Sequence, residues 1–230
     1  MRVINGNSYA PDYLTGTRYS DLIRGWGGSD VLFGYAGNDS ILGGDGNDYI
    51  DGGDGNDKLY GEYGYDVIFG GNGNDYIDGG DKSDRLYGGY GNDSMKGGDG
   101  NDLLSGLYGN DIMVGGSGSD SYTDFSRYTG HDTISDCNFS MSDTNNTADN
   151  VYLNNFLSDS VKYRILDTNH DSTVDALKIY FASGSDLTIW NYFAGDGTIN
   201  PGIDSNINFH FADAIFNYYD IIEHLGNIPV

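Results

Sequence analysis

One apolar position recurs every nine residues through the first half of the chain. The residues on either side of it vary and are often polar, which is the alternation expected of a short strand with one buried face. A glycine opens each of twelve consecutive units, and most units carry another at the fourth position. Because glycine adopts positive φ angles at little cost, we expect the first six residues of a unit to form a tight turn and the last three a strand. The apolar column is Leu14, Ile23, Leu32, Ile41, Ile50, Leu59, Ile68, Ile77, Leu86, Met95, Leu104, Met113 and Tyr122.

A period without a single slip predicts a coil of stacked units. Two units are expected to make one turn of the coil, with a strand on each side, so that each unit stacks on the second unit after it. Stacked strands lie about 4.8 Å apart. Each strand then buries only one large side chain, which contributes about 1.5–3 kcal/mol. The predicted class is all-β, with a narrow core.

The sixth position of the unit is always aspartate. Asparagine is used freely one position earlier, as at Asn38 and Asn47, yet it never replaces the aspartate. Carboxylates stacked about 5 Å apart repel by roughly 3 kcal/mol at an effective dielectric constant of about 20. The bare stack is therefore not expected to hold unless a divalent cation lies between the turns. The aspartate column is Asp12, Asp21, Asp30, Asp39, Asp48, Asp57, Asp66, Asp75, Asp84, Asp93, Asp102, Asp111 and Asp120.

The ligands that the units offer favour calcium. Aspartate carboxylates and the carbonyl groups of glycine-rich turns are hard oxygens, which suit Ca²⁺. Mg²⁺ requires a stricter octahedral geometry, and Zn²⁺ prefers cysteine and histidine, neither of which occurs in a unit before residue 120. The alternative is that the aspartates only form turns. Turn formation, however, does not require aspartate alone at one position of every unit.

These units carry the consensus Gly-Gly-x-Gly-x-Asp-x-U-x, with U a large apolar residue, most clearly at residues 43–51 and 52–60. Over residues 7–123 they resemble the RTX, or haemolysin-type, calcium-binding nonapeptide. The resemblance implies a right-handed parallel β-roll with two nonapeptides per turn. It implies calcium ions between the turns, held by the sixth-position carboxylates and by turn carbonyls. It also implies a secreted, extracellular protein that leaves by bacterial type I secretion and whose partner is the type I secretion apparatus.

The implied metal ligands extend beyond the regular repeat. A degenerate unit at residues 127–135 places Asp132 in phase after a three-residue insertion. Sites that use Asp66 and Asp84 are expected to be weak or vacant, because their turns depart from the glycine pattern. The units at residues 7–24 are expected to form a degenerate N-terminal cap. The candidate calcium ligands are Asp21, Asp30, Asp39, Asp48, Asp57, Asp66, Asp75, Asp84, Asp93, Asp102, Asp111, Asp120 and Asp132.

The charge balance narrows the range of partners. The chain of 230 residues has a formal net charge of −24, and all its acidic residues except Glu62 and Glu223 are aspartates. Such a charge argues against nucleic acid, which requires a basic surface. No stretch approaches the roughly 20 apolar residues of a transmembrane helix. A single cysteine, Cys137, excludes an internal disulfide and a cysteine-based zinc site.

The glycine period ends after about residue 124. The β-roll is therefore assigned to residues 1–126, and residues 127–230 are expected to form a β-rich cap that protects the open edge of the coil. The segment at residues 213–219 suits a short helix or a strand. Alternating runs predict strands at residues 161–165, 176–181 and 187–190.

Two further features lie in the C-terminal part. The run Asp167-x-Asn169-x-Asp171 is similar to the start of an EF-hand loop, but that loop needs glycine and glutamate where Ser172 and Lys178 stand. A polar hairpin tip is the preferred interpretation. The hydrophobic stretch at residues 218–222 suits a type I secretion signal, by the same resemblance. The four histidines are scattered in sequence and are expected to have structural or exposed roles.

Enzyme motifs are absent from the sequence: it contains neither His-Glu-x-x-His nor Gly-x-Ser-x-Gly. We expect no catalytic role for this chain, which would be either the C-terminal portion of a larger exoprotein, with any activity in an upstream domain, or a small stand-alone protein. The first hypothesis is a module that is unfolded without Ca²⁺ and folds on extracellular Ca²⁺, in support of secretion and stability. The alternative is an extracellular adhesin or ligand-binding module. Its contact surface would be an outward apolar stripe, which would also suit a dimer: Val31, Phe33, Tyr49, Val67, Phe69, Tyr87 and Leu103.

Overall fold

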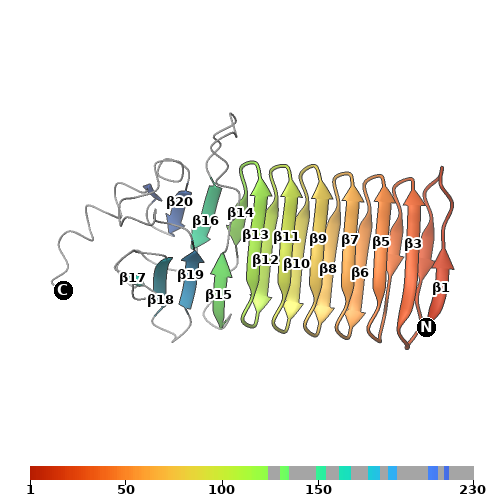
Figure 1. Cartoon of the computed structure of the whole chain (residues 1–230), viewed down its shortest axis with the longest axis horizontal. Helices are drawn as coiled ribbons and strands as arrows, with labels where there is room; N and C mark the ends of the chain where they lie inside the picture. Colours follow the sequence, from red (N-terminus) through yellow and green to blue (C-terminus); the bar gives the residue numbers. More distant parts are fainter. Residues whose placement is uncertain are drawn as a thin grey trace.

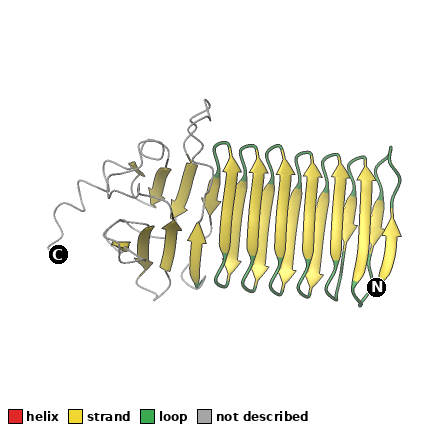
Figure 2. Ribbon diagram, in the orientation of Figure 1, coloured by secondary structure: helices red, strands yellow, loops and turns green. Residues whose placement is uncertain are grey.

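The structure is a computed structural model that describes most of the N-terminal part of the chain and selected strands of the rest. Within these residues the chain forms strands joined by turns, without a helix (Figure 2). No helix in this part of the chain has the length and hydropathy that crossing a membrane requires. The described residues are 1–123, 130–134, 149–153, 161–166, 176–181, 186–190, 207–211 and 215–217.

Successive strands alternate between two sheets, and each sheet runs along the long axis of the molecule (Figure 1). The odd-numbered strands of the first sheet, here called the odd sheet, are β1 (Arg2–Asn5), β3 (Asp21–Gly27), β5 (Ser40–Asp45), β7 (Lys58–Tyr63), β9 (Tyr76–Asp81), β11 (Ser94–Asp99), β13 (Ile112–Ser117) and β15 (His131–Ile134). The even sheet contains β2 (Tyr13–Thr15), β4 (Val31–Phe33), β6 (Tyr49–Asp54), β8 (Val67–Asn72), β10 (Arg85–Tyr90), β12 (Leu103–Tyr108), β14 (Ser121–Thr123) and β16 (Asp149–Leu153).

Strands that are two units apart in sequence pair in parallel. In the even sheet, Ile68 lies opposite Ile50 on one side and Leu86 on the other, so the register advances by 18 residues from rung to rung. The same offset holds in the odd sheet, where Leu59 lies between Ile41 and Ile77. This confirms the prediction of an all-β coil in which two nonapeptides make one turn.

The core is the single apolar column that the period predicts. From Ile23 to Met113 every side chain of this column is at most 1% exposed. Leu14, in the first unit, is only half-buried because it lies near the open N-terminal end. The column includes a side chain with a polar group at Tyr122. The hydroxyl of Tyr122 accepts a hydrogen bond of 2.8 Å from the backbone N–H of Gly115. The two sheets are therefore held together by one layer of side chains.

The strands are longer than the sequence indicates. A typical strand such as β6 includes the last three residues of one unit and the first three of the next. The glycines that were assigned to the turn thus still pair across rungs: the N–H of Gly34 donates to the carbonyl of Asp51 at 2.8 Å. Positive φ is confined to particular positions, such as Gly44 at 112°. The turn proper is limited to the fourth to sixth positions, because the backbone of the first three continues the parallel ladder.

The outward stripe expected on alternate units lies on the even sheet. Its rings form a continuous series of contacts: the centroids of Phe33 and Tyr49 are 5.8 Å apart, those of Tyr49 and Phe69 5.5 Å, and those of Phe69 and Tyr87 4.8 Å. Such tilted and stacked ring pairs stabilise a sheet beyond the area that they bury.

Both sheets continue past residue 126. In the odd sheet, β13 pairs in parallel with β15 and β15 with β19 (Asp186–Trp190), after which β18 (Ala176–Phe181) and β17 (Val161–Leu166) add antiparallel. In the even sheet, β16 pairs in parallel with β20 (Ile207–Phe211), and β21 (Ile215–Asn217) adds antiparallel.

The structure therefore contains the three strands predicted in this part, and the segment expected as helix or strand includes a strand. Cys137, residues 167–175 with the EF-hand-like run, and the candidate secretion signal at residues 218–222 lie outside the described residues.

Candidate metal centre

The aspartates of the sixth position line the two edges of the coil, each at the end of a turn and directly before a strand. One edge carries Asp12, Asp30, Asp48, Asp66, Asp84, Asp102 and Asp120, and the other carries Asp21, Asp39, Asp57, Asp75, Asp93, Asp111 and Asp132. From Asp21 onward every one of them is at most 3% exposed. The structure thus stacks all the predicted ligands, including Asp132 after its insertion. Buried unpaired carboxylates are rare in proteins and require an explanation.

One oxygen of each carboxylate is used by the protein itself. The backbone N–H of an aspartate donates to Oδ1 of the aspartate 18 residues later, as from Asp39 to Asp57 at 2.7 Å and from Asp57 to Asp75 at 2.8 Å. The ladder continues across the insertion, where the N–H of Asp111 donates to Asp132 at 3.1 Å. Oδ1 therefore joins each turn to its neighbour, and the carboxylate is held in one orientation.

The second oxygen, Oδ2, has no hydrogen-bond partner among the described residues over ten consecutive units. These atoms are fully buried from Asp30 to Asp111. A buried polar atom without a partner costs about 1–3 kcal/mol, and more when it carries charge. The residues concerned are Asp30, Asp39, Asp48, Asp57, Asp66, Asp75, Asp84, Asp93, Asp102 and Asp111.

The first two rungs satisfy Oδ2 by other means. Oδ2 of Asp12 accepts a hydrogen bond from the backbone N–H of Asn7 at 2.6 Å. Oδ2 of Asp21 accepts two hydrogen bonds from Thr17, one from its N–H and one from its hydroxyl, both at 2.7 Å. Burial would raise the pKa of Asp21, but these bonds and one from the N–H of Arg2 hold its pKa below the ordinary value. The expected N-terminal cap thus differs from the later units in its hydrogen bonds as well as in its sequence. A cation would stabilise Asp21 less than the later candidates, because Oδ2 of Asp21 already accepts hydrogen bonds.

From Asp30 to Asp102, a carbonyl oxygen of the following turn lies close to each unpartnered Oδ2. A Cβ atom added at Gly52 would lie 2.5 Å from Oδ2 of Asp57 and 2.6 Å from the carbonyl oxygen of Gly70. The same arrangement recurs at Gly70, where Oδ2 of Asp75 and the carbonyl of Gly88 meet the added atom. The first-position glycine is therefore required for space rather than for a positive φ. It leaves a recess in which hard oxygens from two stacked turns converge.

Burial dominates the electrostatics of the column. It raises the pKa of Asp57 to about 6, that of Asp66 to about 7 and that of Asp84 to about 8. Neighbouring carboxylates raise these pKa values further, and the backbone hydrogen bond to Oδ1 offsets only part of the effect. Without a cation, the folded coil therefore favours protonated side chains that are charged in the unfolded chain.

The metal-free protein is accordingly expected to lose stability as the pH rises. A carboxyl group whose pKa is higher in the folded than in the unfolded chain binds more protons when folded, so its contribution falls between pH 3.8 and the raised values of about 6 to about 8. Far-ultraviolet circular dichroism in excess chelator should show more residual β-structure at pH 5 than at pH 8. More β-structure at pH 8 would contradict this account of the column. With calcium present, β-structure should instead be greater at pH 8 than at pH 5, because protons compete with the ion for the carboxylates.

The donor set fits calcium and fits few other ions. Within the described residues no three His, Cys, Asp or Glu side chains converge on one point, so an ion between turns would be held by few carboxylates and by backbone carbonyls. Ca²⁺ accepts six to eight such oxygens in flexible geometry, whereas Zn²⁺ requires nitrogen or sulfur ligands. The residues that would hold it are the aspartates with an unpartnered Oδ2 and the first-position glycines of the next turn.

The units of Asp66 and Asp84, expected to be weak or vacant, show the same pattern as their neighbours. The N–H of Asp48 donates to Asp66 and that of Asp66 to Asp84 at 2.7 and 2.8 Å, and in both aspartates Oδ2 is unpartnered. Lys82 takes the place of a glycine by adopting a φ of 83°. The structure thus gives no geometric reason to separate these two positions from the rest.

The asparagines of the fifth position form a second ladder, which the sequence alone does not reveal. The N–H of Asn74 donates to Oδ1 of Asn56 at 2.9 Å, and the N–H of Asn92 donates to Asn74 at 2.8 Å. Serine substitutes at some rungs, as where Asn47 donates to the hydroxyl of Ser29. The recurrence of asparagine beside the aspartate was visible in the sequence. Its role requires an acceptor 18 residues away, which only the stacking reveals.

A family model and a solved structure match this chain. The family model of the RTX calcium-binding nonapeptide repeat matches in four copies, at residues 8–41, 27–59, 51–86 and 87–122, which together span half of the chain. No curated protein sequence is significantly similar. Among solved structures, the chain is similar to the solution structure of the AlgE6R3 subunit from the Azotobacter vinelandii mannuronan C5-epimerase. The identity is 19% and the TM-score 0.23, and the match covers 86% of this chain and 83% of that chain.

Proposed function

This chain belongs to the family of RTX calcium-binding nonapeptide repeats, and from that premise we propose that it is a calcium-triggered folding module. Calcium ions would be held along both edges of the coil and would supply the free energy that the apolar column alone lacks. The proposal assigns no catalytic step to the chain, in keeping with the absence of nucleophile and metallopeptidase motifs from its sequence.

The observation that carries the proposal is the run of ten buried Oδ2 atoms, from Asp30 to Asp111, for which the described part of the chain offers no hydrogen-bond partner. Each costs about 1–3 kcal/mol in the metal-free fold. These penalties repeat at every rung, whereas each strand contributes one buried side chain to the core. A bound divalent cation converts the largest unfavourable contribution into a favourable one, since each carboxylate then faces positive charge.

The calcium dependence suits a protein that must cross a membrane before it folds. Extracellular calcium-binding modules have dissociation constants of about 10⁻⁴–10⁻³ M. At the far lower calcium concentration of a cytosol the sites would stay empty and the chain, with a net charge of −24, would remain expanded. Outside the cell, ion binding and folding would occur together, as in other small metal-dependent domains. We propose that the protein is exported unfolded by a type I secretion apparatus and acts in the extracellular space.

Small-angle X-ray scattering tests this function directly. In excess chelator the radius of gyration should approach about 50 Å, the value of an unfolded chain of this length, and in 10 mM CaCl₂ it should fall to roughly 20 Å. The transition should occur between 0.1 and 1 mM free Ca²⁺ on the scale of about 10⁻⁴–10⁻³ M for extracellular modules. Mg²⁺ at 10 mM serves as the control for ionic strength and should not compact the chain. A compact chain in chelator would refute the proposal.

A second candidate function is an extracellular adhesin or ligand-binding module that uses the even sheet. It is favoured by the aromatic ladder from Tyr13 to Tyr87, in which successive ring centroids lie 4.8 to 5.8 Å apart. Binding to cells or to a glycan array by the calcium-loaded protein would support it. Exchange of Phe69 for serine should then abolish binding and leave circular dichroism unchanged. Unaltered binding by that variant would exclude this face.

A further inference from the structure

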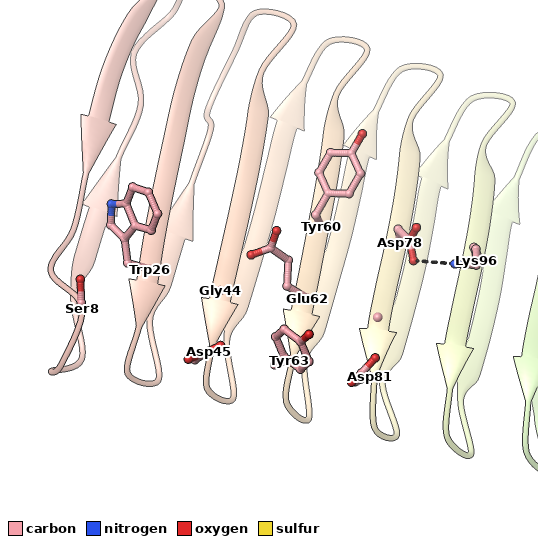
Figure 3. A pocket seen from close by; sticks show the side chains of 11 residues that line it. Ser8, Trp26, Gly44, Asp45, Tyr60, Glu62, Tyr63, Asp78, Asp81 and Lys96 are labelled. Carbon is pink, nitrogen blue, oxygen red and sulfur yellow. Dashed lines mark ion pairs between the residues drawn. The ribbon is translucent and has the colours of Figure 1, made fainter.

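A groove of 600 Å³ runs across the outward face of the odd sheet and reaches Asp45, Tyr63 and Asp81, the last strand residues before the turns. It extends from β3 to β11 and is open to solvent (Figure 3). The aromatic side chains that line it are Trp26, Tyr60 and Tyr63, and the indole and the Tyr63 ring are 53% and 61% exposed. The calcium site does not use any of these side chains.

The groove forms because large side chains alternate with glycine at the second position of the repeat along the odd sheet. Along the odd sheet the second position of successive turns holds Trp26, Gly44, Glu62 and Gly80. Two strand spacings separate Trp26 from Glu62, about 10 Å, and Gly44 lies between them. Trp26 and Glu62 thus form two walls, and the glycine leaves the floor between them open, as Figure 3 shows.

The walls stand where the repeat prefers glycine. Trp26 and Glu62 have φ angles of 76° and 74°, in the left-handed region that other residues adopt only with strain. The same position of the even sheet also carries non-glycine residues with positive φ, at Tyr35 and Leu107. Those two lie outside the groove. They provide control positions of matched backbone conformation on the opposite face.

The lining is acidic. It includes four carboxylates and one ammonium group, and that ammonium, of Lys96, lies 3.5 Å from Asp78. One further cation stands beside the lining, the guanidinium of Arg24, which lies 5.9 Å from the centroid of the Trp26 ring. Among the described residues, no ion pair involves the other three carboxylates, those of Asp45, Glu62 and Asp81. A ligand that fits must therefore present positive charge as well as an apolar face for the rings.

We propose that this groove binds an amino-sugar oligosaccharide, with pyranose rings against Trp26 and Tyr63 and protonated amines toward Glu62, Asp45 and Asp81. The apolar C–H face of a pyranose stacks on an indole or a phenol, and an ammonium group is attracted both by the ring face and by the carboxylates. The hydroxyl groups have carboxylate acceptors within the same groove. Anionic glycans are excluded by the same charges.

The experiment is calorimetric titration of the full, calcium-loaded chain with three tetrasaccharides: β-1,4-linked glucosamine, its fully N-acetylated counterpart and an oligouronate. Circular dichroism of each sample verifies the fold. The glucosamine tetramer should bind at least tenfold more tightly than the acetylated one, and the oligouronate should not bind. Equal binding of the first two, or any preference for the uronate, would overturn the proposal.

Four glycine variants locate the site. Trp26→Gly and Glu62→Gly should each weaken glucosamine-tetramer binding at least tenfold, while the fold is retained because glycine is unstrained at these φ angles. Tyr35→Gly and Leu107→Gly, at the same repeat position of the even sheet, should leave binding unchanged. Losses of similar size in all four variants would refute the groove as the site. Tetralysine, which has the same charge as the fully protonated glucosamine tetramer, should bind more weakly than the sugar. If tetralysine instead binds as tightly, and the Trp26→Gly variant binds it equally well, charge attraction alone explains the binding.

Discussion

Exchange of Asp57, Asp75 and Asp93 for asparagine is expected to raise the calcium concentration required for folding by about tenfold or more, equivalent to roughly 1.4 kcal/mol or more. These residues occupy three successive rungs of one edge, and in each of them Oδ2 is buried without a partner. Asparagine keeps Oδ1, so the backbone hydrogen bonds of 2.7 to 2.9 Å that the preceding rungs donate can persist. It replaces Oδ2 with an amide nitrogen, which cannot bind calcium. Circular dichroism during a Ca²⁺ titration measures the midpoint.

A second triple variant distinguishes ligand loss from loss of negative charge. Asp54, Asp81 and Asp99 are exposed aspartates of the third repeat position in strands of the same coil. Their exchange for asparagine also removes three negative charges, and it relieves general repulsion without removing any unpartnered Oδ2 atom. The charges of Asp54 and Asp99 act on the column carboxylates of Asp57 and Asp102, so the midpoint should rise by no more than a small part of the shift in the first variant. If the two triple variants raise the midpoint equally, the buried oxygens are not the calcium ligands.

Replacement of Ile68 by alanine is expected to destabilise the calcium-loaded protein by about 2–5 kcal/mol. Ile68 is fully buried and lies between Ile50 and Leu86 in a core that is one side chain thick. Each repeat contacts only its neighbours, so a defect in the middle of the coil weakens both adjoining turns and no second layer of side chains fills the gap. Urea unfolding at saturating Ca²⁺ gives the change in free energy.

Val67 provides the matched control for this substitution. It precedes Ile68 in β8, points to the outward face of the same sheet and is half-buried. Alanine at this position should change the free energy of unfolding by no more than about 1 kcal/mol, since little buried volume is lost. Equal destabilisation by the two substitutions would show that the apolar column is not the principal core.

The period of nine residues was enough to predict which positions are buried, which strands pair and where the carboxylates stack. Leu59 and Asp57, for example, take the places that a coil with two units per turn assigns to them. The strand lengths were predicted less well. Glycine was interpreted as a turn residue, but Gly34 pairs across rungs like any strand residue. Residue propensity alone cannot distinguish a glycine in a turn from a glycine that pairs across rungs, because the pairing uses only backbone hydrogen bonds.

The chemistry of individual rungs depends on contacts that a linear pattern does not contain. Asp21 and Asp30 occupy equivalent positions in sequence, yet Thr17 donates to Oδ2 of Asp21, whereas no described residue donates to Oδ2 of Asp30. The groove on the odd sheet is likewise not predictable from the linear pattern. Trp26 and Glu62 stand where the consensus has glycine, and the open floor between them depends on which units stack.

Anomalous X-ray diffraction from crystals grown in millimolar CaCl₂ tests the central claim most directly. The claim is that the unpartnered Oδ2 atoms are calcium ligands. We predict anomalous density next to Oδ2 of Asp48, Asp57 and Asp75, and none next to Oδ2 of Asp12, which Asn7 already satisfies. An absence of density beside those three atoms, in crystals in which the coil has the same fold, would contradict the account.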